Sequence, residues 1–351
     1  MTYIFYILLI VIFCHLGGQK NRLSILFRVA ACLLYICFVG FRHFKVGVDS
    51  ERYMELFYAI PNQNYQWIEI GFDRLIRILD GAGFSYTGLF LACITLTAIP
   101  IFFTLEKTKH YTLSAIMLYV LTLSTLMNGM RQCISVGLFF YGSHFIRERK
   151  MIPFFLCMTG ALLFHYSCVF LLPFYFFLHR TLPKYMYIFV YAISFLFIFV
   201  DVAPLLESSA VLISGIGRNY AEDYQYYAYS FGSLSILGFL YNTSVNLLLF
   251  WLITSTNAQR RFPVMTNCSI LSFALKNLSF NMPIVGRIAQ YFAWFPFMLI
   301  PYLVVDSMKN RDMRRLEIAG ILLLYGIGFF HSLFSSEMKM LPYIFNLKIF
   351  Q

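Results

Sequence analysis

Charged residues are scarce in this chain: Asp, Glu, Lys and Arg make up 12% of its 351 residues, whereas hydrophobic residues make up 60%. A soluble domain usually keeps about a quarter of its residues charged. With so few charges the chain cannot cover a water-facing surface, so we expect its surroundings to be lipid. Its length allows ten or more membrane spans of about 20 residues each.

Familiar nucleotide-binding and hydrolase motifs are missing as well. The sequence has no Walker loop, no H-E-x-x-H, no G-x-S-x-G and no glycine-rich dinucleotide turn. ATP-driven transport and nucleotide-dependent redox chemistry therefore have no sequence support. The eight cysteines lack metal-type spacing, so we interpret them as buried thiols and predict neither a metal nor another cofactor.

Basic residues exceed acidic ones and give the chain a net charge of +11. They lie in short clusters between apolar runs rather than in one patch, so we predict no nucleic-acid partner. Such clusters are typical of cytoplasmic loops, which set the orientation of membrane proteins.

The apolar runs predict an all-α, polytopic integral membrane protein with about 11–12 transmembrane segments. We expect a single transmembrane domain, 1–351, with a GT-C-like arrangement as one option. An outer loop at 42–83 and a tyrosine-rich outer loop at 206–232 are its largest polar segments. The runs are 2–16, 23–41, 84–105, 111–127, 131–146, 152–178, 185–205, 233–254, 262–280, 288–305 and 318–334.

The run 152–178 carries His165-Tyr166-Ser167 in its middle. If it folds as two short arms that meet at His165, either broken or re-entrant, six basic clusters all become cytoplasmic. This topology places both the N-terminus and the C-terminus outside. The clusters hold 16 of the 27 Lys and Arg residues and are Lys20/Arg22/Arg28, Lys107/Lys109, Arg147/Arg149/Lys150, Arg180/Lys184, Arg260/Arg261 and Lys309/Arg311/Arg314/Arg315.

Polar side chains interrupt the apolar sequence around Arg131. Together with Asn128, Gln132 and Ser135 it has the spacing i, i+3, i+4 and i+7, which predicts one face of a helix. A charge in hydrocarbon is costly, so we expect this face to line a wet or ligand-filled groove. The alternative is an arginine that extends to the lipid headgroups.

Arg287 opens a similar pattern with Gln290 and Trp294. A proline and a glycine shortly before it predict that a helix starts near Arg287. The positive end of that helix dipole would favour a docked phosphate. An interfacial anchor is the alternative. Arg218 lies in the tyrosine-rich loop, which suits sugar rings and lipid headgroups equally.

Further candidates lie on the same predicted outer side. His165 titrates near neutral pH and is able to accept or donate a proton, with a structural histidine as the alternative. Asp49 and Glu51 form a D-x-E pair of the kind that binds divalent metal in some membrane glycosyltransferases, although a solvated loop explains it as well. The stretch WIEIGFDRLIRIL predicts an amphipathic helix on the outer interface.

A family resemblance is carried by NGMRQCISVGLFFYGSHFIRERK, ALLFHYSCVFLLPFYFFL, MPIVGRIAQYFAWFPFMLIPYL, GVDSERY and LPYIF. These stretches resemble the EpsG family of bacterial exopolysaccharide proteins, which is grouped with Wzy-type polysaccharide polymerases. The resemblance implies an inner-membrane glycosyltransferase that joins repeat units of O-antigen, capsule or other exopolysaccharide on the outer face. Its substrate would be an oligosaccharide on undecaprenyl pyrophosphate, and its partners a flippase and a chain-length regulator of the same pathway.

The resemblance also implies roles for individual residues in a metal-free reaction. Arginine holds phosphate oxygens bidentately, so we expect arginines to clamp the pyrophosphate leaving group. We expect either His165 or Asp49 to take the proton of the acceptor hydroxyl. The candidate substrate- and pyrophosphate-binding residues are Arg131, Arg287, Arg218, Asn128, Gln132, Gln290 and Tyr53.

Three other functions stay open. A flippase or transporter of the lipid-linked unit would also need a cationic cavity, but should show repeat symmetry and polar residues on both sides of the midplane. A different glycosyltransferase or ligase would use a metal at Asp49 and Glu51 and a single-sugar lipid monophosphate. The third is a scaffold within a polysaccharide export complex.

Overall fold

The computed structural model describes residues 1–62, 68–200, 236–280, 283–308 and 312–351. In these ranges the regular elements are helices, and the prediction of an all-α protein is confirmed. The chain divides into two compact units. Unit 1 comprises residues 1–176, 300–305 and 325–351, and unit 2 comprises 177–299 and 306–324.

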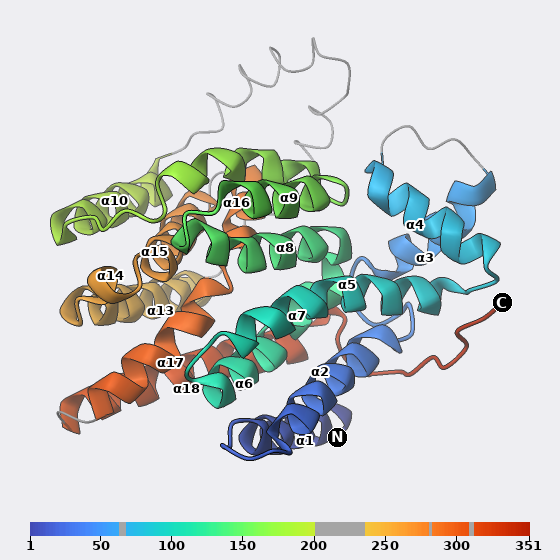
Figure 1. Ribbon diagram of the computed structural model, residues 1–351, viewed down its shortest axis with the longest axis horizontal. Coiled ribbons are helices and arrows are strands. Elements are labelled where there is room, and N and C mark those ends of the chain that lie inside the picture. The colour runs from blue at the N-terminus through green and yellow to red at the C-terminus, as the bar shows by residue number, and fades with distance from the viewer. Residues whose placement is uncertain (63–67, 201–235, 281–282, 309–311) are drawn as a thin grey trace, which may run out of the picture. The chain divides into compact units, whose positions relative to one another are not determined.

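Unit 1 is a series of helices that lie side by side (Figure 1). Each apolar run packs on the next, so side chains that would be costly in water contact one another or lipid. The order is α1 (Thr2–Gly17), α2 (Ser24–Gly40), α5 (Tyr86–Glu106), α8 (Met130–Arg147) and α9 (Met151–Leu162), with α6 (Tyr111–Leu121) packed on α1 and followed by α7 (Leu123–Asn128).

Helix length separates α5 from the other apolar elements. Among the described residues only α5 is both long and apolar enough to cross a membrane, with a mean hydropathy of 2.2 over 18 residues. The shorter apolar helices have 10–17 residues. Two predicted spans are divided between separate helices. The run 111–127 breaks at Thr122 between α6 and α7, and the run 288–305 breaks between α16 (Pro283–Phe292) and α17 (Phe295–Met308).

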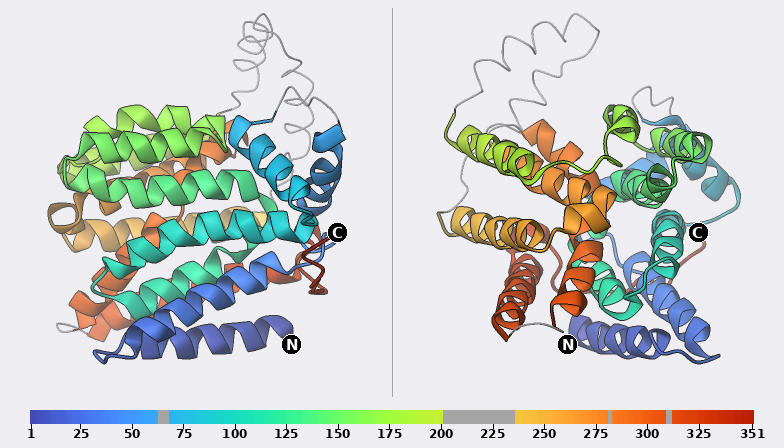
Figure 2. Two further views of the ribbon diagram at one scale, coloured as in Figure 1. Left: turned by 45° about the vertical axis from the view of Figure 1, so that its right-hand side comes forward. Right: turned by 60° about the vertical axis from the view of Figure 1, so that its left-hand side comes forward.

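The two ends of unit 1 differ in charge. One end, here called the basic end, holds the turns 18–23, 107–110 and 148–150 and three of the predicted basic clusters. Arg28 pairs there with Glu106 at 2.8 Å. The opposite end, here called the site end, carries α3 (Ser50–Ala59) and α4 (Ile70–Gly81), as Figure 2 shows.

The run 152–178 forms two arms. α9 leads from the basic end to the site end, and the 3-10 helix η2 (Tyr166–Phe176) returns, so that the ring centroids of Phe154 and Tyr175 lie 5.1 Å apart. With 12 and 11 residues, the arms are about 18 Å and 22 Å long at the usual rise per residue. His165 therefore lies at the tip of a helical hairpin.

Arg42 ties three segments together at the site end. Its fully buried guanidinium donates hydrogen bonds to Val39 O at 2.7 Å, Ser50 Oγ at 3.2 Å and Met127 O at 3.2 Å, and it lies 4.3 Å from the ring centroid of Phe90. Burial lowers the pKa of Arg42 to about 10, so the group keeps its charge at neutral pH. Carbonyl and hydroxyl acceptors thus replace the water that this cation has lost.

The C-terminal segment 335–351 lies along the site end in a largely extended conformation. Its backbone joins the loop after α2 and the start of α5, and the hydroxyl of Tyr3 in α1 donates to Met340 O at 3.0 Å. The backbone hydrogen bonds, at 2.7–2.9 Å, are Gly47 N to Lys339 O, His43 N to Ile344 O, Asn346 N to Phe41 O and Ser85 N to Ile349 O.

Unit 2 has its own buried polar joint. Asn267 donates to Leu178 O at 2.7 Å and to Arg180 O at 2.8 Å, and it accepts from the Tyr187 hydroxyl at 2.6 Å. These bonds fix the loop before α10 on α15. The helices of unit 2 are α10 (Lys184–Leu196), α13 (Ile236–Ser255), α14 (Ala258–Arg261), α15 (Pro263–Leu278) and α16. Helices α17 and α18 (Asp312–Phe334) are divided between the units.

Replacing Arg42 by methionine is expected to lower the free energy of unfolding by about 2 kcal/mol or more, because Val39 O, Ser50 Oγ and Met127 O each lose a hydrogen bond from the guanidinium. Thermal unfolding of the purified protein in detergent measures this. Lys45→Met, at an exposed position three residues away, is the control and should change the midpoint little. Equal midpoints for both variants would contradict a joint at Arg42.

Candidate functional site

The buried carboxylate of Glu69 joins two of the predicted site residues. One carboxylate oxygen, Oε2, accepts a hydrogen bond from Arg131 Nη1 at 2.5 Å, and the other, Oε1, lies 3.0 Å from His165 Nδ1. The side chain of Glu69 is only 7% exposed, against 15% for His165 and 27% for Arg131. These three residues are called the Glu69 cluster below.

The backbone delivers Glu69 to this place. Glu69 is the last residue before α4, and its carbonyl accepts the N–H groups of Phe72 and Asp73, both at 3.0 Å. A carboxylate at the start of a helix lies near the positive end of the helix dipole. The position thus favours the ionised form even before any partner arrives.

Gly71 brings the start of α4 against the hairpin tip. Its N–H donates to Leu163 O at 2.8 Å, and a Cβ atom at this position would lie only 2.6 Å from the same oxygen. Ser135 fixes the hairpin from the other side, because its hydroxyl donates to Ala161 O at 2.6 Å. Together these contacts set the distance between Glu69 and His165.

Electrostatics keep Glu69 ionised despite its burial. Burial alone would raise the pKa of the Glu69 carboxyl, but the hydrogen bond with His165 and the charge of Arg131 outweigh it and hold the pKa below the usual range. At neutral pH the Glu69 side chain is therefore a carboxylate next to the guanidinium of Arg131.

Aromatic rings enclose the guanidinium of Arg131. Its central carbon lies 5.5 Å from the ring centroid of Phe72 and 6.0 Å from that of Tyr53. Burial raises the pKa of Tyr53 to about 12 even though Arg131 acts in the opposite direction, so the phenol stays neutral. Tyr53, Phe72 and Ile76 belong to one buried hydrophobic cluster with residues of α5 and α8.

The two ring nitrogens of His165 have different surroundings. Nδ1 faces Glu69, whereas Nε2 is buried without a hydrogen-bond partner in the described part of the chain. A carboxylate beside Nδ1 favours the tautomer with its proton on Nδ1, which leaves a lone pair on Nε2. Nε2 is thus the group of this cluster that is ready to accept a proton.

The prediction of one helical face is wrong for Asn128, whereas Arg131, Gln132 and Ser135 lie together on α8. The backbone leaves the helix at Gly129, so Asn128 ends α7 while Arg131 and Gln132 lie in the first turn of α8. Asn128 Oδ1 instead accepts the Val48 N–H at 2.6 Å and holds the loop before α3. The Ser135 hydroxyl donates to the α9 backbone. The side chains of Asn128 and Ser135 therefore bind neighbouring backbone groups.

The D-x-E pair lies at the start of α3. Asp49 precedes the helix and its carbonyl accepts the Tyr53 N–H at 3.0 Å, while both Asp49 and Glu51 are exposed. No group of three or more metal-ligating side chains gathers within the described ranges, at this pair or elsewhere. The loop therefore presents its two acids to the surroundings of the site end.

The remaining candidates lie apart from these residues in the chain. Arg287, exposed, and Gln290, half-buried, belong to α16 in unit 2, whereas Arg218 lies outside the described residues, as does the loop 206–232. The prediction that a helix starts near Arg287 is wrong, because α16 begins at Pro283 and Arg287 is its fifth residue. Trp294 follows the end of this helix.

The family model EpsG matches residues 24–345, which is most of the chain. The chain belongs to the EpsG family. This family is associated with Wzy-type polymerases, so the chain is a polysaccharide polymerase-like membrane protein. No curated protein and no solved structure matches it significantly. The whole Glu69 cluster of this EpsG protein lies inside the matched range.

Glu69 is the residue of this EpsG protein that sequence reasoning missed. It stands in WIEIGFDRLIRIL, where the period of the apolar residues drew attention to the helix rather than to its first acid. A signal was present: only 16 residues of the chain are acidic, and Glu69 lies on the predicted outer side with Arg131 and His165. A cation within an apolar sequence is often paired with a carboxylate, and few carboxylates were available.

Gly71→Ala is expected to destabilise the protein by about 1–3 kcal/mol, because the added methyl group must push α4 away from Leu163. Gly81→Ala is the matched control on the same helix, since a Cβ atom there meets nothing within 4 Å. Thermal unfolding of both variants in detergent compares them. A control that unfolds as early as Gly71→Ala would show that the close approach carries no weight.

The pair Glu69–Arg131 should show a coupling energy of about 1–3 kcal/mol in a double-mutant cycle built from Glu69→Gln and Arg131→Gln. The exposed pair Arg52–Glu55, with side chains 62% and 52% exposed, provides the matched cycle and should give less than about 0.5 kcal/mol. Unfolding free energies of the seven proteins, with the wild type common to both cycles, are the measurement. A site coupling no larger than the surface coupling would contradict this reading of the cluster.

Proposed function

We propose that the Glu69 cluster is the catalytic centre of a glycosyltransferase that polymerises oligosaccharide repeat units carried on undecaprenyl pyrophosphate. The observation that supports it is the buried Glu69 carboxylate, which orients His165 and Arg131 at the same time. Buried ionisable groups in a membrane protein are costly and mark functional sites by default. Membership of the EpsG family supplies the class of reaction.

His165 acts as the general base. The hydroxyl oxygen of the acceptor unit attacks the anomeric carbon of the growing chain, the bond from that carbon to the pyrophosphate oxygen breaks, and the hydroxyl proton passes to His165 Nε2. Glu69 accepts the Nδ1–H and stabilises the imidazolium that forms. Because Nε2 is covered in this structure, the side chains over it must move before an acceptor can enter.

Arg131 acts on the leaving group. Its pairing with Glu69 neutralises part of its charge, so it contributes fixed orientation more than raw attraction. Guanidinium groups hold phosphate oxygens in defined geometry and stabilise the charge that develops as the bond breaks. Tyr53 and Gln132 are the further predicted pyrophosphate and sugar contacts within unit 1, while Asp49 is the alternative base.

The topology that suits this reaction places the site end outside the bacterial inner membrane. Three basic clusters lie at the other end of unit 1, as the positive-inside rule requires of a cytoplasmic face. The hairpin of α9 and η2 is then re-entrant, because arms of about 18–22 Å are shorter than the 30 Å hydrocarbon layer. Both termini are outside, and a GT-C-like arrangement remains the expected fold type.

His165→Gln is expected to reduce polymer synthesis by about a hundredfold or more, since loss of a general base costs this much. The variant is expressed in cells that lack the native protein, and surface polysaccharide length is read on a gel at matched protein level. His144→Gln is the control, because His144 forms a similar pair with Glu148, at 2.8 Å, at the end of α8 that lies at the basic end.

The fate of the substrate separates the functions. Loss of a polymerase leaves single lipid-linked units accumulating on the outer leaflet, whereas loss of a flippase or transporter leaves them on the inner leaflet. Long chains from His165→Gln at a normal protein level would remove this residue as the base. Accumulation on the inner leaflet would favour transport instead.

A further inference from the structure

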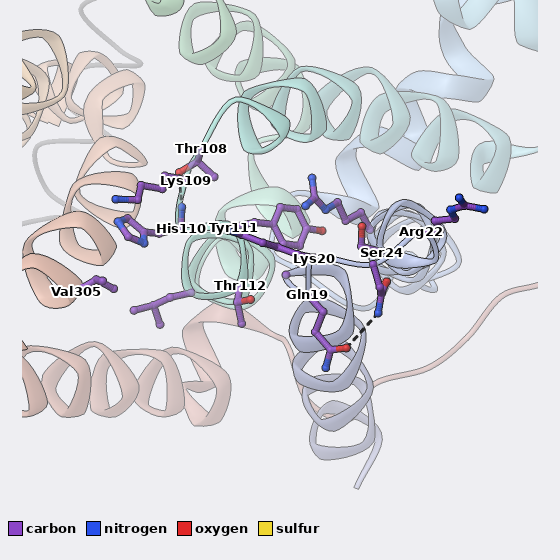
Figure 3. A pocket seen from close by; sticks show the side chains of 14 residues that line it. Gln19, Lys20, Arg22, Ser24, Thr108, Lys109, His110, Tyr111, Thr112 and Val305 are labelled. Carbon is purple, nitrogen blue, oxygen red and sulfur yellow. Dashed lines mark hydrogen bonds between the residues drawn. The ribbon is translucent and has the colours of Figure 1, made fainter.

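A cavity of about 730 Å³ opens at the basic end of unit 1. It lies between the turn that joins α1 to α2 and the turn that leads into α6. Figure 3 shows Lys109 and His110 on one side of Tyr111, and Gln19 and Arg22 on the other. The cavity is separated from the Glu69 cluster by the length of α5, whose 21 residues span about 30 Å.

The lining of this cavity is basic and rich in hydrogen-bond donors. Lys20, Arg22 and Lys109 contribute exposed cations, and none of the described residues that line it is an Asp or a Glu. Arg28 also lines it, but its charge is already paired with Glu106 at 2.8 Å. The cavity therefore holds at least three positive charges that no carboxylate among its described lining residues offsets.

Polar groups in the lining of the cavity add to these cations. The lining includes the hydroxyl groups of Ser24, Thr108 and Thr112 and the first residues of α6. The first turn of a helix carries N–H groups without intrahelical acceptors and the positive end of the dipole, which favour an anion. The cationic side chains and the positive end of the helix dipole would therefore both attract an anionic ligand.

The walls of the cavity are held in place. Gly18 packs so closely on α6 that a Cβ atom would lie 1.8 Å from the Thr112 hydroxyl oxygen. On the other side, the Tyr302 hydroxyl receives hydrogen bonds from Thr108 Oγ1 at 3.0 Å and from Lys109 N at 3.1 Å. Arg28 donates to Gly17 O at 2.7 Å and covers the Tyr111 ring at 4.5 Å. A preformed site loses little ordering entropy when a ligand binds.

We infer that this cavity binds a phosphate group, either the headgroup of an anionic phospholipid or a soluble phosphate ester. A volume of about 730 Å³ accommodates a headgroup, and pockets for small ligands commonly measure about 300–1,000 Å³. Lysine and arginine side chains next to a membrane attract anionic lipids, and arginine matches the geometry of phosphate oxygens. The site is independent of the polymerase centre and needs no particular orientation of the protein in the membrane.

The test uses Lys20→Gln/Lys109→Gln, because both side chains are exposed and their replacement leaves the packing intact. The thermal unfolding midpoint of the purified protein is followed during titration with phosphatidylglycerol in mixed micelles, with phosphatidylcholine as the neutral lipid. A parallel titration uses inorganic phosphate, with chloride at matched ionic strength. The saturable rise of the midpoint gives an apparent affinity.

The wild type should show a saturable response to phosphatidylglycerol, to inorganic phosphate or to both, and none to phosphatidylcholine or chloride. The double variant should bind about thirtyfold more weakly, as expected for two lost cations near a membrane surface. Arg149→Gln is the control, an exposed cation at the same end outside the cavity, and it should keep its affinity within about twofold.

The two titrations identify the source of the phosphate. A response to the lipid alone assigns a membrane headgroup, and a response to free phosphate alone assigns a soluble ester. Equal weakening in Arg149→Gln and in the double variant would reduce the effect to the general charge of this end and overturn the site. Absence of any response to either phosphate probe in the wild type would overturn it as well.

Discussion

The carboxylate of Glu69, shared between Arg131 and His165, is the interaction on which the site end depends. A buried carboxylate without partners would tend to take up a proton, so Glu69 stays ionised because Arg131 and His165 lie beside it. Removing one partner of such a pair would leave the other charge uncompensated. A carboxylate beside Nδ1 also favours a proton on that nitrogen, so the contact that stabilises the site end also orients His165.

Backbone geometry makes that interaction possible. The hairpin of α9 and η2 places His165 at its tip, and the absence of a side chain at Gly71 lets α4 approach that tip. Arg42 and the C-terminal segment then close the same end around α3. Cationic side chains gather at the opposite end, so unit 1 separates its buried charge network from its exposed one.

The lengths of the apolar runs and the positions of the charges predict most helices of this chain, because both depend on which segments lie in an apolar environment and which lie in water. The break at His165 follows from the same charges, since a single crossing would put basic clusters on both sides. Contacts between particular side chains could not be predicted in this way. The sequence around Glu69 does not distinguish it from a solvated acid, and only the tertiary structure brings it to Arg131. The stripe through Asn128 failed for a local reason, the break at Gly129, which periodicity alone does not register.

The extended segment 335–351 has a consequence for the order in which unit 1 is assembled. Its partners are Tyr3 in the first helix, the loop after α2 and the start of α5, all of which leave the ribosome long before it. Contacts between residues so distant in the chain form late, because their loops must close first. The early helices are therefore synthesised before this end of unit 1 can close, and it closes only after the segment 335–351 has followed them.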